Sequence, residues 1–311
     1  MRAATTTSPV IAAVLAGAVL LTACESDVRA RQGDDCRTEA TPSTGTGTGP
    51  GSGTGTGGES GARVVATTGL GPVPEECRGR ERTVEFEVTN AKPEPYTYTV
   101  VLAVVDISSG RELVREPVTV GSVQAGGTVR RTFDAAAVPE AVPNRTRAEI
   151  RTVRSVPADE VGSPPGGCPP SGVRIAADQG NAAMGLRDVG VTLTNCGTRP
   201  YALNGHPGLT PLDEDHRPLD GVRILPGGGD IALVTGFDAA PEPLTLKPGE
   251  SATTALMWRN THTGHGAAAN APYVRLVPKP GAPPVTLIPE LDLGTTGKLG
   301  VGAWKRRQEN R

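Results

Sequence analysis

The feature that most restricts the fold is an alternation of apolar and polar residues that begins near Arg82. Val84, Phe86 and Val88 alternate with polar residues, the pattern of a half-buried strand. The segment 96–105 (YTYTVVLAVV) is β-branched and aromatic, as expected of a central strand. No long stretch carries a convincing helical repeat, and 41 Gly and 29 Pro among 311 residues are many for a helical protein. We therefore predict an all-β protein.

Further short strands are expected along the rest of the chain, and their spacing favours sandwiches. The segments are 113–120, 128–133, 148–156, 187–194, 231–235, 252–258, 273–277, 285–288 and 299–304. The last of these would close the second sheet. The basic tail Lys305-Arg306-Arg307 is expected to be solvated.

Landmarks of the first half of the chain recur in the second half. Asn90 and Asn195 are each followed, six residues later, by a tyrosine that comes after a proline. A corner glycine then leads into a strand: Gly126 lies 36 residues after Asn90, and Gly249 lies 54 residues after Asn195. This indicates two copies of one sandwich, the second with extra residues within 204–243, although chance similarity is an alternative. Long loops on a rigid scaffold often carry binding function.

The N-terminus is typical of an exported chain. Arg2 supplies a positive start, and 10–21 (VIAAVLAGAVLL) has the length of a signal-peptide core but is too short to span a membrane. The sequence Leu21-Thr22-Ala23-Cys24 resembles a lipobox, whose cysteine becomes the acylated first residue of the mature protein. The resemblance implies lipidation at Cys24 and a place on the extracytoplasmic face of the cell membrane. An ordinary secretory signal with a chance cysteine is the alternative.

Four cysteines remain after Cys24. An even number in an exported chain predicts two disulfide bonds, with three pairings open. We favour Cys36–Cys77 and Cys168–Cys196, since each pair then stays within one predicted domain. Four free thiols are the alternative.

The segment 41–61 contains mainly Thr, Gly, Ser and Pro and is expected to be flexible. Its repeated glycines do not indicate a phosphate-binding loop, because no strand precedes them and no amphipathic helix follows. It lies between Cys36 and Cys77. A bond between these cysteines would turn it into a loop and leave residues 25–35 as the working tether.

The predicted organisation has four parts, and the linker between its two sandwiches is the Pro/Gly-rich segment 163–170. The parts are a lipoprotein signal peptide (1–23), a lipidated N-terminus with the Gly/Thr-rich segment (24–62), an immunoglobulin-like β-sandwich (63–160) and a second β-sandwich (161–311).

The second sandwich resembles a domain of unknown function, DUF4232, common in actinobacterial lipoproteins. The resemblance covers about residues 167–304, and the motifs that carry it are Cys168, LTNCG at 193–197, NGHPG at 204–208 and LKPGES at 246–251. The family usually has Gly-Tyr-Pro where this chain has Gly205-His206-Pro207. The resemblance implies a disulfide-bearing immunoglobulin-like sandwich and no known activity. The first sandwich resembles, more loosely, immunoglobulin-like domains of bacterial surface proteins.

Residues that suggest chemistry are few. His262 and His265 lie three residues apart in the polar loop 260–270 and are weak metal candidates, because zinc sites need three or four ligands. An exposed loop is the alternative. The acidic cluster Asp213-Glu214-Asp215-His216 lacks the spacing of a helix-loop-helix calcium site and is expected to be a solvated turn.

Together these features predict a non-enzymatic, membrane-anchored surface lipoprotein without a cofactor. Its partners would be the membrane, through lipid on Cys24, and an unknown envelope protein or polymer, contacted through loops 204–243 and 260–270. A net charge of −2 without a basic, aromatic surface gives no expectation of nucleic-acid binding. The alternatives are a small-solute or metal-binding lipoprotein that uses His262 and His265 and, less favoured, an envelope hydrolase with acidic catalysts.

Overall fold

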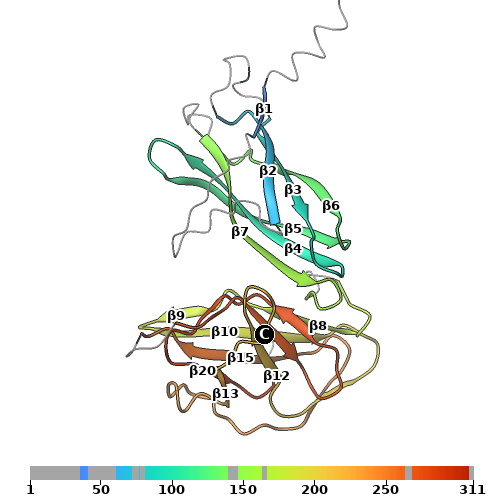
Figure 1. Ribbon diagram of the computed structural model, residues 1–311. Helices are drawn as coiled ribbons and strands as arrows, with labels where there is room; N and C mark the ends of the chain where they lie inside the picture. Colours follow the sequence, from blue (N-terminus) through green and yellow to red (C-terminus); the bar gives the residue numbers. More distant parts are fainter. Residues whose placement is uncertain are drawn as a thin grey trace, which may run out of the picture.

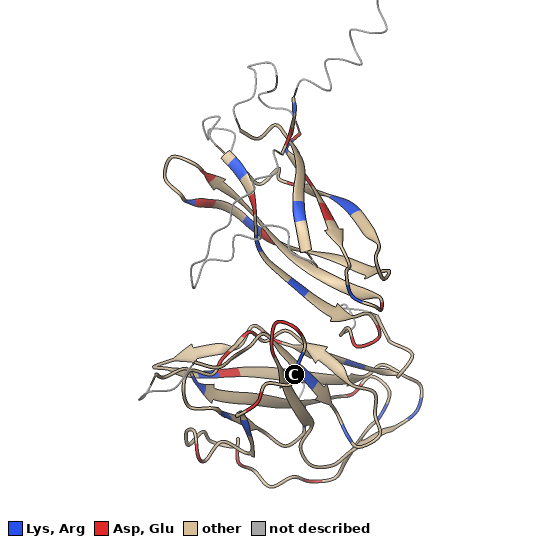
Figure 2. Cartoon of the chain, in the orientation of Figure 1, with Lys and Arg blue, Asp and Glu red and all other residues tan. Residues whose placement is uncertain are grey.

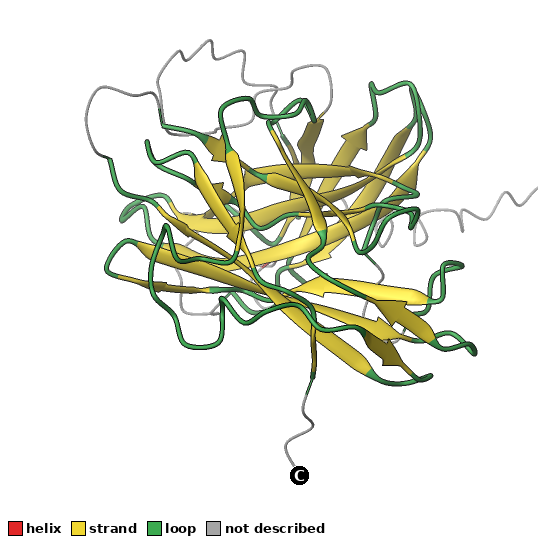
Figure 3. Cartoon of the chain, turned by 90° about the horizontal axis from the view of Figure 1, so that it is seen from below, coloured by secondary structure: helices red, strands yellow, loops and turns green. Residues whose placement is uncertain are grey.

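The protein is all-β, as the alternation predicted, and its strands form two stacked modules (Figures 1 and 3). The computed structural model describes residues 36–40, 61–71, 77, 81–138, 146–162, 167–262 and 268–307. No helix among these residues is long and apolar enough to cross a membrane. The signal-like segment with Cys24 and nearly all of the Gly/Thr-rich segment lie outside the described residues.

The first module packs two antiparallel sheets against each other. One sheet has the order β1-β2-β3-β6, and the other has the order β5-β4-β7. Their strands are β1 (Arg37–Glu39), β2 (Gly61–Thr68), β3 (Thr83–Thr89), β4 (Tyr96–Asp106), β5 (Glu112–Val123), β6 (Thr128–Asp134) and β7 (Thr146–Pro157). The alternating residues Val84, Phe86 and Val88 are fully buried in the core between the sheets.

The second module has one large sheet, in which β13, β20, β15, β10 and β8 follow one another and β9 and β21 pair off this path. Its strands are β8 (Val173–Ala177), β9 (Asn181–Ala183), β10 (Leu186–Asn195), β13 (Arg223–Pro226), β15 (Ser251–Arg259), β20 (Lys298–Val301) and β21 (Lys305–Arg306). A separate core, which includes Leu193, Leu256 and Trp304, lies beneath this sheet.

Smaller sheets complete the second module: β12-β17-β18, β11-β14 and β16-β19. Their strands are β11 (Tyr201–Leu203), β12 (Gly208–Leu212), β14 (Leu244–Leu246), β16 (Asn270–Ala271), β17 (Tyr273–Val277), β18 (Val285–Leu287) and β19 (Leu291–Asp292).

One prediction of local structure is wrong. The segment 231–235 is not a strand, because Ile231 N–H and Ala232 N–H both donate to Gly228 O and form a turn. The tail 305–307 is exposed, as predicted, but Lys305 and Arg306 also form β21 and pair with β15. The Arg306 guanidinium donates to the Glu250 carboxylate at 2.5 Å, so the positive charge of Arg306 is paired within the module.

The recurring asparagines have the same structural role in the two modules. Asn90 Nδ2 donates to Glu94 O (2.8 Å) and to Val123 O (2.9 Å). Asn195 Nδ2 donates to Arg199 O (2.8 Å) and to Leu246 O (2.9 Å). Both side chains are buried, and so are their bonds to Val123 O and Leu246 O, so each amide satisfies a carbonyl group that is shielded from water. The repeat seen in the sequence is therefore a repeat of structure.

Neighbouring bonds repeat as well. The N–H groups of the corner glycines Gly126 and Gly249 donate to the carbonyls of Asn90 and Asn195 respectively. Both glycines have positive φ (68° and 86°), a conformation that favours glycine. A cross-strand hydroxyl pair follows in each module, Thr89 with Thr128 and Thr194 with Ser251.

The extra residues of the second module lie where the sequence placed them. Tyr96 pairs with Val123 across β4 and β5, and Tyr201 pairs with Leu246 across β11 and β14. Residues 204–243 therefore interrupt a hairpin that is continuous in the first module. They contribute β12, β13 and the turn that follows β12.

Candidate functional site

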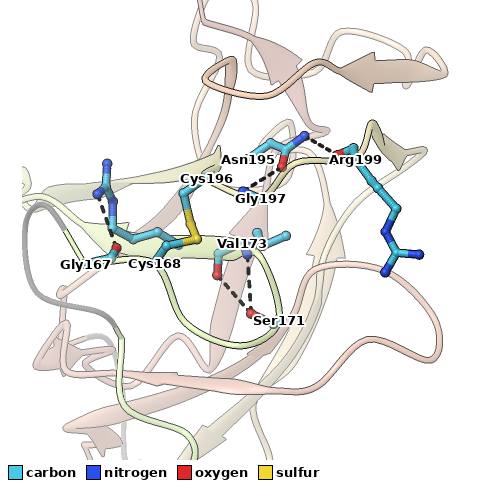
Figure 4. The surroundings of a disulfide bond; sticks show 9 residues. Gly167, Cys168, Ser171, Val173, Asn195, Cys196, Gly197 and Arg199 are labelled. Carbon is cyan, nitrogen blue, oxygen red and sulfur yellow. Dashed lines mark hydrogen bonds between the residues drawn. A yellow bond between two sulfur atoms is a disulfide. The ribbon is translucent and has the colours of Figure 1, made fainter.

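Both disulfide bonds pair as predicted. Cys36 is bonded to Cys77, and Cys168 is bonded to Cys196. The second bond ties the segment before β8 to the end of β10, directly beside Asn195, whose side chain contacts the backbone of Gly197 and Arg199 (Figure 4). The first bond closes a covalent loop that contains residues 41–60.

The histidine loop is only partly described. His262 is exposed, and His265 lies outside the described residues. Among the residues that the structure describes, no group of three or more His, Cys, Asp or Glu side chains could hold a metal ion.

The acidic cluster builds a turn that positions a histidine. Asp213 Oδ1 accepts from Asp215 N–H (2.9 Å) and Arg217 N–H (2.8 Å), which closes the turn after β12. His216 sits in this turn with φ of 64°, an uncommon conformation for a residue other than glycine. The Asp213 carboxylate is thus engaged by the backbone of its own turn, and the turn directs His216 toward the first module.

His216 lies between aromatic rings of the two modules. Its ring stacks on Tyr273 of β17 with centroids 4.2 Å apart, and it meets the edge of Tyr96 of β4 at 5.5 Å. Its Nε2 is 3.3 Å from Ser155 Oγ of β7. Ser155 N–H also donates to the Tyr273 hydroxyl at 3.1 Å. These four side chains form the centre of a joint between the modules.

Burial affects the titration of this group. Desolvation is the main cause that lowers the pKa of His216 below its ordinary value of 6.5, and the nearby Lys92 lowers it further. Glu160 and Asp213 act in the opposite direction. Desolvation likewise raises the pKa of Tyr273 and of Tyr96 above 10.0. The neutral forms of the stacked rings are therefore favoured.

Ion pairs connect the modules at one side of these rings, where charged segments of the two modules face each other (Figure 2). Arg154 of β7 donates through Nε to Glu290 Oε1 at 2.5 Å and through Nη1 to Glu214 Oε2 at 2.9 Å. Arg154 is mostly buried, whereas both carboxylates are more exposed. One guanidinium from the first module thus joins two segments of the second.

The chain after β7 packs directly onto the second module. Thr286 N–H donates to Glu160 O (2.8 Å), and its hydroxyl donates to Glu160 Oε2 (2.6 Å). Arg275 of β17 forms an ion pair with the same carboxylate. Val161 forms a bridge with Thr286. Together with the apolar cluster of Val156, Leu212 and Tyr273, these bonds hold the modules in one relative orientation.

The joint was not anticipated from the sequence. Its residues come from β4, β7, the inserted turn and β17, and no local pattern relates them. The one available signal was His216, a histidine within an acidic turn of the inserted segment. Part of the predicted contact segment 204–243 is therefore engaged inside the molecule.

Comparison with known proteins finds a matching family for the second module only. Residues 168–305 match the family model described as "Domain of unknown function (DUF4232)", which confirms the resemblance of this region. No curated protein matches the chain. Among solved structures the chain is similar to red sea bream transglutaminase, with 12% sequence identity and a TM-score of 0.22, over 81% of this chain and 32% of that one. A TM-score this low carries no structural or functional implication.

Proposed function

We propose that this protein is a non-enzymatic lipoprotein of the cell envelope that presents two joined sandwiches to a partner protein or polymer. The observation that carries the proposal is the pair of disulfide bonds, one at each module. Such bonds persist in oxidising compartments outside the cytosol, which agrees with an export signal at 1–23 and lipidation at Cys24.

The joint supports a role in presentation. A flexible linker would let each module sample orientations independently, whereas the aromatic stack and the Arg154 ion pairs restrict them. Rigid presentation lowers the entropy that is lost when a partner contacts both modules at once.

The disulfide bonds also support a short tether. Because Cys36 is bonded to Cys77, only residues 25–35 separate the proposed lipid from the first module. Fully extended, this segment spans at most about 36–40 Å. The modules would then stand close to the membrane.

The anchor is tested by Cys24→Ser in the native host, with metabolic labelling by a clickable palmitate analogue. We expect the wild-type protein in the membrane fraction with label, and the variant in the soluble or secreted fraction without it. Retention of the variant in the membrane fraction would contradict the lipid anchor.

The interaction role is tested by crosslinking in intact cells, followed by identification of what co-purifies with the wild-type chain. We expect a reproducible envelope component. If nothing is captured, and a defined small molecule instead raises the melting temperature, the alternative of a solute-binding lipoprotein replaces this proposal.

A further inference from the structure

The strand β6 borders the four-stranded sheet of the first module, and no described strand lies on its outer side (Figure 1). The bonds from Ala135 N–H to Arg82 O and from Asn90 N–H to Gly127 O fix the phase of the β3–β6 ladder. Bonding alternates along an antiparallel strand. The backbone groups of the even-numbered residues from 128 to 134 therefore face away from β3, and among the described residues no backbone group pairs with them.

The corresponding edge of the second module is filled. The Thr–Thr and Thr–Ser hydroxyl pairs make Thr128 of β6 the counterpart of Ser251 of β15. Beyond β15, the chain's own C-terminal segment forms β20 and β21. Arg307 N–H donates to Ser251 O (2.9 Å), and Gly302 N–H donates to Ala255 O (3.0 Å). The same edge thus accepts a strand in one copy of the module and is open in the other.

Charge distinguishes the two edges. Where the second module is filled, Glu250 precedes the strand and pairs with Arg306 of the incoming segment. The open edge instead carries Arg130 and Arg131, and a basic segment is visible on β6 in Figure 2. Arg130 bonds to Glu87 at 2.6 Å, whereas no described carboxylate pairs with Arg131.

Arg131 also limits which strands can pair with this edge. Its side chain alternates with Val129 and Phe133 on the core-facing side of β6, yet it is exposed, and its Nη1 donates to the outward carbonyl of Arg130 at 3.0 Å. An inward-pointing charge on an edge strand prevents indiscriminate pairing. An incoming segment that supplied both a backbone donor and a carboxylate would replace this contact.

From these observations we infer that the β6 edge binds an extended, carboxylate-bearing segment of a partner protein, added as a further antiparallel or parallel strand. A second copy of this chain is disfavoured where β6 would pair with β6 about Arg130 or Arg131, because like charges would then lie opposite each other. The inference rests on the proposed interaction function and names the surface and the partner chemistry.

The test uses the full chain and two fluorescein-labelled peptides of about eight residues, the usual reach of one added strand. One peptide alternates Val with Glu and the other alternates Val with Lys, and binding is read by fluorescence anisotropy. Thr132→Pro removes an outward N–H without touching the bonds to β3, and Thr132→Val is its matched control. Arg131→Glu reverses the charge.

We expect the Val–Glu peptide to bind the wild type and Thr132→Val alike, and to bind Thr132→Pro at least about tenfold more weakly. Arg131→Glu should bind the Val–Lys peptide more tightly than the Val–Glu peptide. This reversal of preference tests the inference even if Thr132→Pro does not fold. Binding that Thr132→Pro and Arg131→Glu both leave unchanged, or no binding of either peptide, would overturn the inference.

Two further outcomes separate the inference from the proposed function. A wild-type dimer that Thr132→Pro converts to monomer in sedimentation would make a second copy the occupant and overturn the acidic partner. If Thr132→Pro and the wild type capture the same partner in cells, the β6 inference fails while the interaction role stands. If the wild type captures none, the interaction role itself fails.

Discussion

At the scale of single residues, the two asparagines should carry a large share of the stability of their modules. Asn90→Ala or Asn195→Ala leaves one buried and one partly buried carbonyl group without its donor, so each variant should lose about 2–4 kcal/mol of unfolding free energy. Asn90 also accepts from Tyr98 and Lys92 N–H, so its replacement should cost more.

Denaturant unfolding of the purified chain measures this loss. Thr89→Val is the control, because it removes only an exposed hydroxyl pair and should change stability by less than about 0.5 kcal/mol. Equal costs for the control and the asparagine variants would show that the buried amides contribute little.

The His216 environment predicts a pH dependence of the joint. Because the pKa of His216 is lowered in the folded state, mainly by desolvation, the unfolded state binds the proton more readily. Stability is therefore undiminished above the ordinary pKa of 6.5 and falls as the pH drops toward the lowered value.

Thermal unfolding of the wild type and of His216→Asn across this range checks the expectation. Asparagine tolerates positive φ and does not titrate, so the variant should lack this part of the pH dependence. Parallel curves for the two proteins would contradict it. An NMR titration of the imidazole would report the pKa of His216 directly.

At the scale of elements, the Cys168–Cys196 bond should stabilise the second module more than it stabilises the first module. The bond closes a separation of 28 residues. In the chain-entropy model such a bond contributes about 3–4 kcal/mol. Cys168→Ala/Cys196→Ala should lower the stability of the second module by that order and leave the first module unchanged.

Hydrogen exchange resolved along the chain distinguishes the modules. The control is Cys36→Ala/Cys77→Ala, which should act on β1 and β2 and leave β10 unchanged. A double variant at Cys168 and Cys196 that destabilised both modules equally would show that they unfold as one unit.

Much at this scale was predictable from the sequence. Alternation located β3 because one face of that strand is buried, and β-branched and aromatic content located the central strand β4. The Asn-to-Gly landmarks located the repeat and its insertion because the same residue types make the same backbone bonds in both modules. The prediction of a strand at 231–235 was wrong, since a run with β-branched residues can also occur in a turn that backbone hydrogen bonds close.

The joint could not be predicted because its contacts join residues far apart in sequence. Arg154 and Glu290 are 136 positions apart, and neither has a distinctive neighbourhood. The open β6 edge could not be predicted either, because it depends on which strands pair in each module. Lipidation at Cys24 stays a prediction.

At the scale of the whole molecule, the modules should move as one body. Arg154→Met removes the ion pairs to Glu214 and Glu290 while keeping most of the side-chain volume, so the joint should loosen. Small-angle X-ray scattering should then show a broader distribution of distances. Arg147→Met, on the same strand but paired within the first module, is the control and should leave the scattering unchanged.

If the protein is anchored to a membrane as proposed, the Cys36–Cys77 bond also determines how it could be released. Residues 41–60 lie inside the covalent loop that it closes, so cutting the backbone there does not separate the two ends. With a specific protease site inserted in this segment, cleavage should give two fragments on a reducing gel and one species on a non-reducing gel. Shedding by a cut at this segment would then require two events, proteolysis and reduction, whereas a single cut within residues 25–35 would suffice.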